Sequence, residues 1–241
     1  MVIVYAATRN LYPRLRGAVA SLLAYNKPDK IYLLIEDDDL PDAYKPSGPC
    51  VCVNAIPLRD KYVSPDGVNR YSIFSWQALL RTAYSEIFTE DKILSLDVDT
   101  IVRGDLTELW ETDLTGKWFA MVPEKCIPQW RPSLYYPKHK TYCNAGVCLY
   151  NLAQLRADGM FKKLRSMIDT VRMDYCEQDA FNHFGFECDK IVLLPLTYNN
   201  CIGCGYSDNP IIQHYAGVRE KWEPGADFYR REWLTQWHNG I

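Results

Sequence analysis

The chain has 241 residues, of which 48% are hydrophobic and 24% charged, and this composition predicts one globular domain over 1–241 with a substantial core. The formal net charge of −3 gives no sign of a surface for nucleic acid or another polyanion. No apolar run is long enough to span a bilayer and the start MVIVYAATRN lacks signal-peptide features, so we expect a cytoplasmic protein of unspecified oligomeric state.

The first half of the chain alternates short apolar runs with helical patterns. Strands that alternate with helices at these lengths predict a largely parallel sheet covered on both faces. In chain order, the pattern predicts a strand over 2–7, an amphipathic helix around 15–23, strands over 30–35 and 51–56, a helix over 72–88, and strands over 92–96 and 100–102.

The second half begins with an interruption of this pattern. The stretch 126–142 holds prolines, aromatics and basic residues, and it predicts a long surface loop. After it we expect a strand over 146–150, helical material to about Val171, a short helix near Gln178, and strands near Val192 and Ile212.

Nine cysteines are scattered along the chain, and their odd number favours reduced thiols over a disulfide framework. Cys201 and Cys204 have the spacing of half a zinc site or of a redox pair. No second pair with this spacing and no His close in sequence accompanies them, so we interpret them as two thiols in a loop.

Two aspartates, Asp97 and Asp99, stand where the apolar run KILSL ends. Ligands of open α/β sheets bind beyond the carboxyl ends of strands, and carboxylates one residue apart on an extended segment point the same way. The pair is therefore a candidate site for one divalent cation beside a diphosphate. Two turn-forming or capping aspartates remain the alternative, and we interpret a similar pair, Asp37 and Asp39, as part of a solvated loop.

Four motifs in order resemble glycosyltransferase family eight, and the resemblance covers nearly the whole chain. They are KILSLDVDTIVRGDLTELWETDL, preceded by Arg81 on a helix, then CNAGVCLYNL, EQDAFN and QHYAGVREKW. The resemblance implies a GT-A fold, which is an α/β fold with a mostly parallel central sheet flanked by helices. It also implies a UDP-sugar donor, a carbohydrate or other hydroxyl acceptor, retention of anomeric configuration, and Mn²⁺ or Mg²⁺ as cofactor.

The resemblance also implies roles for individual residues. Asp97, Asp99 and His214 would bind the metal, and mixed nitrogen and oxygen ligation suits Mn²⁺. The donor would contact Ala6, Ala7, Thr8, Asn10, Arg81, Asp97, Val98, Asp99, Asn144, Ala145, Gly146, His214, Gly217 and Lys221.

This sequence departs from the family's pattern at two positions that concern the donor. Thr8 stands where an acidic residue is frequent, and Glu220 stands where the family has a phosphate-binding lysine. We expect Lys221 to reach the β-phosphate instead, with Arg81 or Arg9 as the other sources of positive charge. The aromatic residues of 126–142, Trp130, Tyr135 and Tyr136, are candidates for stacking on an acceptor sugar.

The resemblance also implies that Glu177 and Gln178 border the anomeric carbon, and we expect them to be the catalytic residues. An amide is a poor nucleophile, so Gln178 favours front-face transfer over a covalent route through Glu177 or Asp179. Two other classes remain open: a sugar nucleotidyltransferase, which usually has a Gly-rich loop after the first strand, and a nucleotide-sugar-binding protein without catalysis. The first strand is followed here by AATRNLYPRLRG, without closely spaced glycines.

Overall fold

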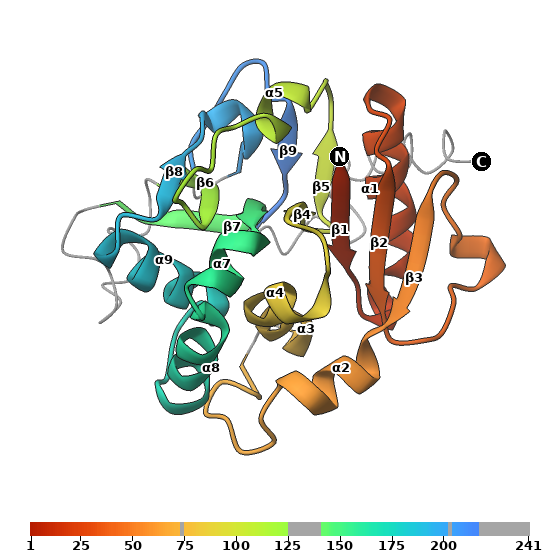
Figure 1. Cartoon of the computed structure of the whole chain (residues 1–241). Coiled ribbons are helices and arrows are strands. Elements are labelled where there is room, and N and C mark those ends of the chain that lie inside the picture. Colours follow the sequence, from red (N-terminus) through yellow and green to blue (C-terminus); the bar gives the residue numbers. More distant parts are fainter. Residues whose placement is uncertain (73–74, 125–140, 202–203, 217–241) are drawn as a thin grey trace.

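The chain folds around a central sheet of seven strands. The computed structural model describes residues 1–72, 75–124, 141–201 and 204–216. The strand order across the sheet is β3-β2-β1-β4-β7-β6-β8 (Figure 1). The strands are β1 Val2–Ala6, β2 Lys30–Ile35, β3 Cys50–Asn54, β4 Lys92–Leu96, β6 Phe119–Pro123, β7 Cys143–Asn151 and β8 Ile191–Leu193.

The strand directions confirm a mostly parallel sheet. β1 pairs in parallel with both β2 and β4, β2 pairs in parallel with β3, and β6 pairs in parallel with β8. β7 is antiparallel to both of its neighbours, β4 and β6. The carboxyl ends of β1, β2, β3 and β4 therefore lie at one edge of the sheet.

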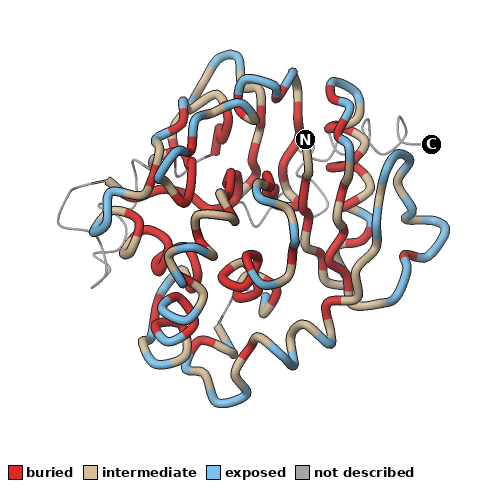
Figure 2. The backbone as a smooth tube through the Cα atoms, viewed as in Figure 1, coloured by how far each residue is buried: buried red, intermediate tan, exposed pale blue. Residues whose placement is uncertain are grey.

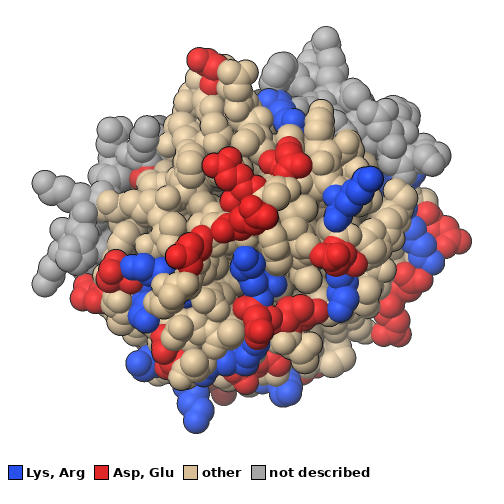
Figure 3. Space-filling view, turned by 45° about the horizontal axis from the view of Figure 1, so that its top comes forward, with Lys and Arg blue, Asp and Glu red and all other residues tan. Residues whose placement is uncertain are grey.

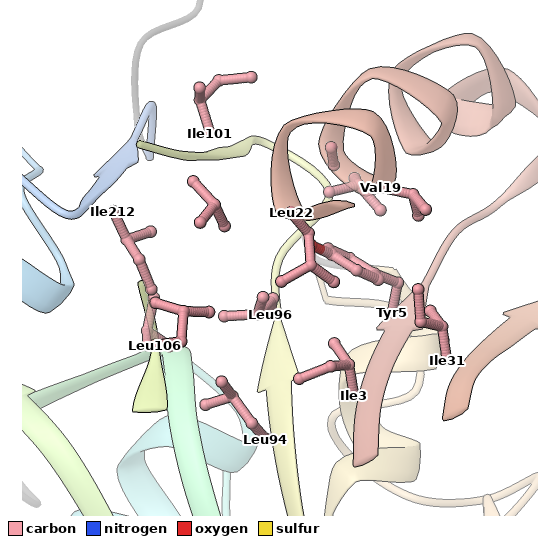
Figure 4. Close-up of a cluster of buried hydrophobic side chains, with 14 of the residues drawn as sticks. Ile3, Tyr5, Val19, Leu22, Ile31, Leu94, Leu96, Ile101, Leu106 and Ile212 are labelled. Carbon is pink, nitrogen blue, oxygen red and sulfur yellow. The ribbon is translucent and has the colours of Figure 1, made fainter. Parts of the chain in front are cut away.

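Both faces of the sheet are covered. Successive side chains of a strand point to opposite faces, so each strand contributes to two separate hydrophobic cores. Ile3 and Tyr5 belong to the core that α1 covers, and Val4 belongs to the core on the other face. Figure 2 shows the buried strands between half-exposed helices, and Figure 4 shows Tyr5 and Ile3 beside Leu22 of α1. The α-helices are α1 Tyr12–Tyr25, α2 Ala55–Tyr62, α3 Trp76–Leu80, α4 Tyr84–Ile87, α5 Thr107–Trp110, α7 Leu152–Ala157, α8 Met160–Thr170 and α9 Glu177–Glu187.

A small second sheet brings two distant segments together. β5 (Thr100–Val102) pairs antiparallel with β9 (Ile212–His214), and Thr100 lies opposite His214 in this register. Figure 1 shows the two strands side by side next to β1 and β4. A residue near the end of the described chain is therefore placed beside the turn that follows β4.

Most of the predicted elements are confirmed, but the helix predicted over 72–88 is wrong as a single element. α3 gives way to a 3-10 helix, η3 (Arg81–Ala83), before α4 begins. The hydroxyl of Thr82 donates to the carbonyl of Leu79 at 2.8 Å, where the helix tightens. β6 and the helices α2 and α5 were not predicted, since short apolar or mixed runs carry little periodicity. Further 3-10 helices are η1 Arg9–Leu11, η2 Asp42–Tyr44 and η4 Leu196–Tyr198.

Two other expectations concern membranes and disulfides. In the described part of the chain, no helix is both long and apolar enough to cross a membrane. None of the cysteines among the described residues is joined in a disulfide.

Candidate active site

The candidate site lies at the edge of the sheet where β1 and β4 end. Tyr5 of β1 lies opposite Leu96 of β4, so Ala6 and Asp97 leave the sheet side by side. Gln77 of α3 donates to the carbonyl of Ala7 at 3.0 Å and fixes the chain beyond β1. The segment after β1, which is predicted to hold the donor base, therefore lies at the same edge of the sheet as the carboxylate pair.

Asp97 and Asp99 lie in a tight turn, so the prediction of an extended segment is wrong. The N–H and the hydroxyl of Thr100 both donate to the carbonyl of Asp97, at 3.1 and 2.7 Å. Val98 is 7% exposed and packs into the hydrophobic core, which anchors the centre of the turn. The turn, rather than the alternation of a strand, makes the two carboxylates converge.

His214 completes a cluster of three metal-ligand side chains. Its Nε2 lies 3.1 Å from Oδ1 of Asp99 and 3.5 Å from Oδ2 of Asp97. A ligand atom from each of the three residues lies within 4.8 Å of the other two. The pairing of β5 with β9 explains this convergence, and the structure thus brings together all three predicted metal ligands.

A chain of hydrogen bonds fixes the tautomer of His214. The backbone N–H of Gly146 donates to Oδ1 of Asn144 at 2.9 Å, so the Asn144 amide nitrogen is the donor to Glu124 at 2.6 Å. Asn199 donates to the same Oδ1 at 2.9 Å, and its own Oδ1 lies 2.8 Å from Nδ1 of His214. Nδ1 therefore carries a proton, and Nε2 is the nitrogen that faces the carboxylates and can bind either a proton or a metal ion.

This arrangement fits a cation. Nε2 of His214 is buried and has no hydrogen-bond partner among the described residues, although two carboxylates face it. Burial lowers the pKa of His214, but the charge of Asp99 and contacts with both carboxylates raise it well above the usual range. A positive charge is thus favoured at Nε2, and a divalent ion would displace the proton.

Gly146 is required by the close approach of these ligands. A Cβ atom at this position would clash with Cε1 of His214 and lie 2.8 Å from Oδ2 of Asp97. The N–H of Asp97 also donates to the carbonyl of Gly146 at 2.8 Å. A strand glycine, predicted only as a donor contact, therefore makes room for the metal ligands.

Arg81 links the metal ligands to the predicted catalytic helix. Its guanidinium forms an ion pair with Asp97 and lies 3.3 Å from both the carboxylate of Glu177 and the carbonyl of Ala145. Burial raises the pKa of Glu177 to about 7 although Arg81 lowers it. Arg81 is thus a positive charge that faces the site from η3.

The first residues of α9 are held in fixed orientations. Oε1 of Gln178 accepts from the N–H of Ala145 at 2.8 Å, and its Nε2 donates to the hydroxyl of Tyr142 at 3.1 Å. Asp179 is fully buried, and its carboxylate accepts from Tyr142 and from two backbone N–H groups. The turn before the helix includes Cys176 at φ 48, a strained conformation for a side chain other than glycine.

The remaining predicted donor contacts are only partly described. The hydroxyl of Thr8 donates to Oδ1 of Asn10 at 2.6 Å, beyond the end of β1. Arg9 is exposed and forms an ion pair with Asp37, so it is directed to the acidic loop after β2. The other predicted residues, Gly217, Arg219, Glu220, Lys221, Trp130, Tyr135 and Tyr136, lie outside the described residues.

Three residues at the site were missed in the sequence. Asn199 and Glu124 support the metal ligands through hydrogen bonds, yet isolated polar residues after short elements show no pattern. Arg14 on α1 is half-buried, and burial lowers its pKa although the negative charge of Asp99 partly offsets this effect. The basic segment RLRG after β1 was the available signal for this second cation near the carboxylates.

Solved structures share this fold over the full chain. An active-site mutant of LgtC has a TM-score of 0.75 at 21% identity, and both chains are covered completely. The galactosyltransferase LgtC in complex with donor and acceptor sugar analogues has a TM-score of 0.69 at 20% identity, again over both complete chains. These similarities establish the GT-A fold.

Sequence relatives carry the name glycosyltransferase. GlyF of Streptococcus pneumoniae is 25% identical over 242 residues, which cover 91% of this chain and 56% of GlyF. GlyD of the same organism is 26% identical over 258 residues, which cover 96% of this chain and 30% of GlyD. The chain thus spans about half or less of the length of these relatives. The family model for glycosyl transferase family 8 matches residues 2–223, and the chain belongs to this family.

Proposed function

We propose that the protein is a retaining hexosyltransferase that uses a UDP-sugar and a divalent cation. The observation that carries the proposal is the cluster of Asp97, Asp99 and His214, in which the hydrogen bonds through Asn199 leave Nε2 as a metal ligand. Membership of family 8 and a fold shared with a galactosyltransferase that binds donor and acceptor analogues support it.

The three ligands suit Mn²⁺, and Mg²⁺ is the other candidate, because two carboxylates and one imidazole form a mixed oxygen and nitrogen set. A bound ion would supply charge neutralisation to the departing diphosphate. Asn199 is the residue that orients His214 towards the ion.

Front-face transfer is the mechanism that these side chains favour. The carboxylate of Asp179 is buried and occupied by three hydrogen bonds, and that of Glu177 is 5% exposed and paired with Arg81. Burial and these partners disfavour either carboxylate as a nucleophile, which supports front-face transfer. In this proposal Gln178 stabilises the positive charge that develops on the sugar, and Glu177 orients the sugar hydroxyls.

The donor pocket combines the segment beyond β1 with the segment around Gly146. Ala6, Ala7, Thr8 and Asn10 would hold the uridine, and Asn144, Ala145 and Gly146 would approach the sugar. Lys221 remains the proposed cation for the β-phosphate. The acceptor is a carbohydrate or another hydroxyl compound. Both acidic and basic side chains lie on the face in Figure 3, so that face shows no preference for an acceptor of one charge.

A donor-hydrolysis assay with Mn²⁺ separates this function from its two alternatives. A glycosyltransferase releases UDP from a UDP-sugar, and a set of UDP-hexoses also identifies the donor. A sugar nucleotidyltransferase releases pyrophosphate from a nucleotide triphosphate and a sugar phosphate. A nucleotide-sugar-binding protein without catalysis gives neither product although UDP raises its melting temperature. Either of the last two results would contradict the proposal.

A further inference from the structure

A second cluster of potential metal ligands lies in the interior beside the proposed catalytic cation. Cys201 is 3% exposed and Cys204 is fully buried. Their sulfur atoms and a carboxylate oxygen of Glu124 all lie within 4.8 Å of one another. Glu124 directly follows β6 and the cysteines follow η4, so this proximity is a product of the fold and not of the sequence spacing.

The backbone around the two cysteines turns both thiols towards one point. The N–H groups of Cys204 and Gly205 donate to the carbonyl of Cys201 at 3.1 and 2.9 Å. Gly205 has φ 121, a conformation that a residue with a side chain rarely adopts. Interactions with the thiol of Cys204 and with the imidazole of His214 lower the pKa of the Cys201 thiol although burial raises it, so the geometry of this loop favours a thiolate. Loops with two cysteines at this spacing commonly present both sulfurs to one zinc ion.

Glu124 has one carboxylate oxygen left for a ligand. Oε1 accepts from Asn144 at 2.6 Å, whereas Oε2 is buried and has no hydrogen-bond partner among the described residues. An unpaired buried carboxylate oxygen is costly unless a proton or a cation satisfies it. The oxygen without a partner belongs to the same carboxylate that approaches the two sulfurs.

We propose that Cys201, Cys204 and Glu124 form a second cation site for a thiophilic divalent ion of the Zn²⁺ class. Two sulfurs and one oxygen suit such an ion, whereas Mn²⁺ and Mg²⁺ favour the oxygen-rich cluster of Asp97, Asp99 and His214. On binding, the two thiols release their protons to solvent and the ion takes two thiolates. A fourth position remains for water or another ligand.

The site has a structural consequence for the catalytic cation. An ion bound there would join the end of β6 to the loop after η4. From Glu124 at the end of β6, a chain of hydrogen bonds runs through Asn144 and Asn199 to His214. The bound ion therefore fastens the residues that orient the catalytic histidine. The proposal does not depend on the identity of the sugar donor.

Co²⁺ is the probe that tests the site, because thiolate ligands give an intense sulfur-to-cobalt charge-transfer absorption and carboxylate and imidazole ligands do not. We expect this absorption when Co²⁺ is added to the reduced protein, and we expect excess Zn²⁺ to abolish it. Cys204→Ser should remove the band. Cys188→Ser, which changes an exposed free thiol, and Asp99→Asn, which changes the other cluster, should leave it intact.

A measurement on the unmodified protein can by itself overturn the proposal, so the test does not depend on whether the variants fold. Absence of the charge-transfer band at saturating Co²⁺ would overturn it. A band that persists in folded Cys204→Ser, with the far-ultraviolet circular dichroism of the parent, would do the same. A mass spectrum that shows Cys201 and Cys204 joined as a disulfide in the freshly purified protein would also count against a cation site.

Discussion

At the scale of single residues, Gly146 gives the sharpest steric test of the metal cluster. A methyl group at this position clashes with the imidazole of His214 and approaches Asp97. We expect Gly146→Ala to fold and to bind Mn²⁺ at least tenfold more weakly, measured by calorimetry. Gly104→Ala is the control, because a Cβ there makes only ordinary contact with Ile211 at 3.5 Å. Parent-like Mn²⁺ affinity in Gly146→Ala would show that the cluster does not bind the ion.

The raised pKa of Glu177 predicts how the stability of the folded protein changes with pH. Burial raises its pKa from 4.5 to about 7 in the folded protein, so the folded state binds the proton more tightly than the unfolded state. The contribution of this group to the free energy of unfolding is fully present below pH 4.5 and is lost as the pH rises to about 7. The loss is on the order of 3 kcal/mol.

Denaturant titrations in the presence of a chelator measure this contribution. Between pH 4.5 and 7, we expect Glu177→Gln to lose stability less steeply than the parent, because glutamine does not titrate. Glu86→Gln changes an exposed carboxyl and should follow the parent. Equal slopes for the parent and Glu177→Gln would refute the assignment of a raised pKa to this group.

At the scale of elements, the loop after η4 controls the orientation of the metal ligand on β9. Asn199 accepts from Nδ1 of His214, and partners of metal-bound histidines typically contribute 10- to 100-fold to metal affinity. We therefore expect Asn199→Ala to weaken Mn²⁺ binding by about tenfold or more. Asn199→Asp retains an acceptor for Nδ1–H but loses the donor to Asn144, so it should restore part of the affinity. Equal affinities for the parent and Asn199→Ala would mean that the imidazole needs no such support.

The segment after β9 supplies the proposed cation for the diphosphate. A diphosphate retains charge that one divalent ion does not neutralise, and a lysine nearby stabilises it as it departs. We expect Lys221→Ala to reduce turnover of the UDP-sugar by 10-fold or more with unchanged folding, and Arg219→Ala to be nearly silent. Full activity in Lys221→Ala would transfer this role to Arg81 or to Arg14, which the charge of Asp99 affects.

At the scale of the whole molecule, periodic elements were predictable and convergences between them were not. The strand Lys30–Ile35 matches its prediction residue for residue, because its mostly buried residues form a continuous apolar run that ends at the acidic stretch after Ile35. Asp97 and Asp99 were predicted from their position where a strand ends, whereas His214 was named only through a family motif. What brings His214 to the aspartates is the pairing of β5 with β9, and no local pattern encodes that pairing.

The supporting residues were beyond sequence reasoning for a related reason. A chain of hydrogen bonds runs from Asn199 through Asn144 to Glu124. Which atom of each side chain donates follows only from the neighbouring residue in this chain. Likewise, Cys201 and Cys204 showed only half of a metal site in the sequence, because the proposed third ligand, Glu124, follows a different strand, β6. Hydrogen bonds between side chains depend on tertiary contacts, so single-sequence patterns give them no signature.

The central claim is that Asp97 and Asp99 bind a cation which in turn binds the donor diphosphate. The most direct test is calorimetric titration of UDP into the parent and into Asp99→Asn, each with and without Mn²⁺. We predict that Mn²⁺ raises the affinity of the parent for UDP at least tenfold and that the variant loses this gain while it remains folded. A variant that keeps the parent's metal-dependent gain would contradict the account.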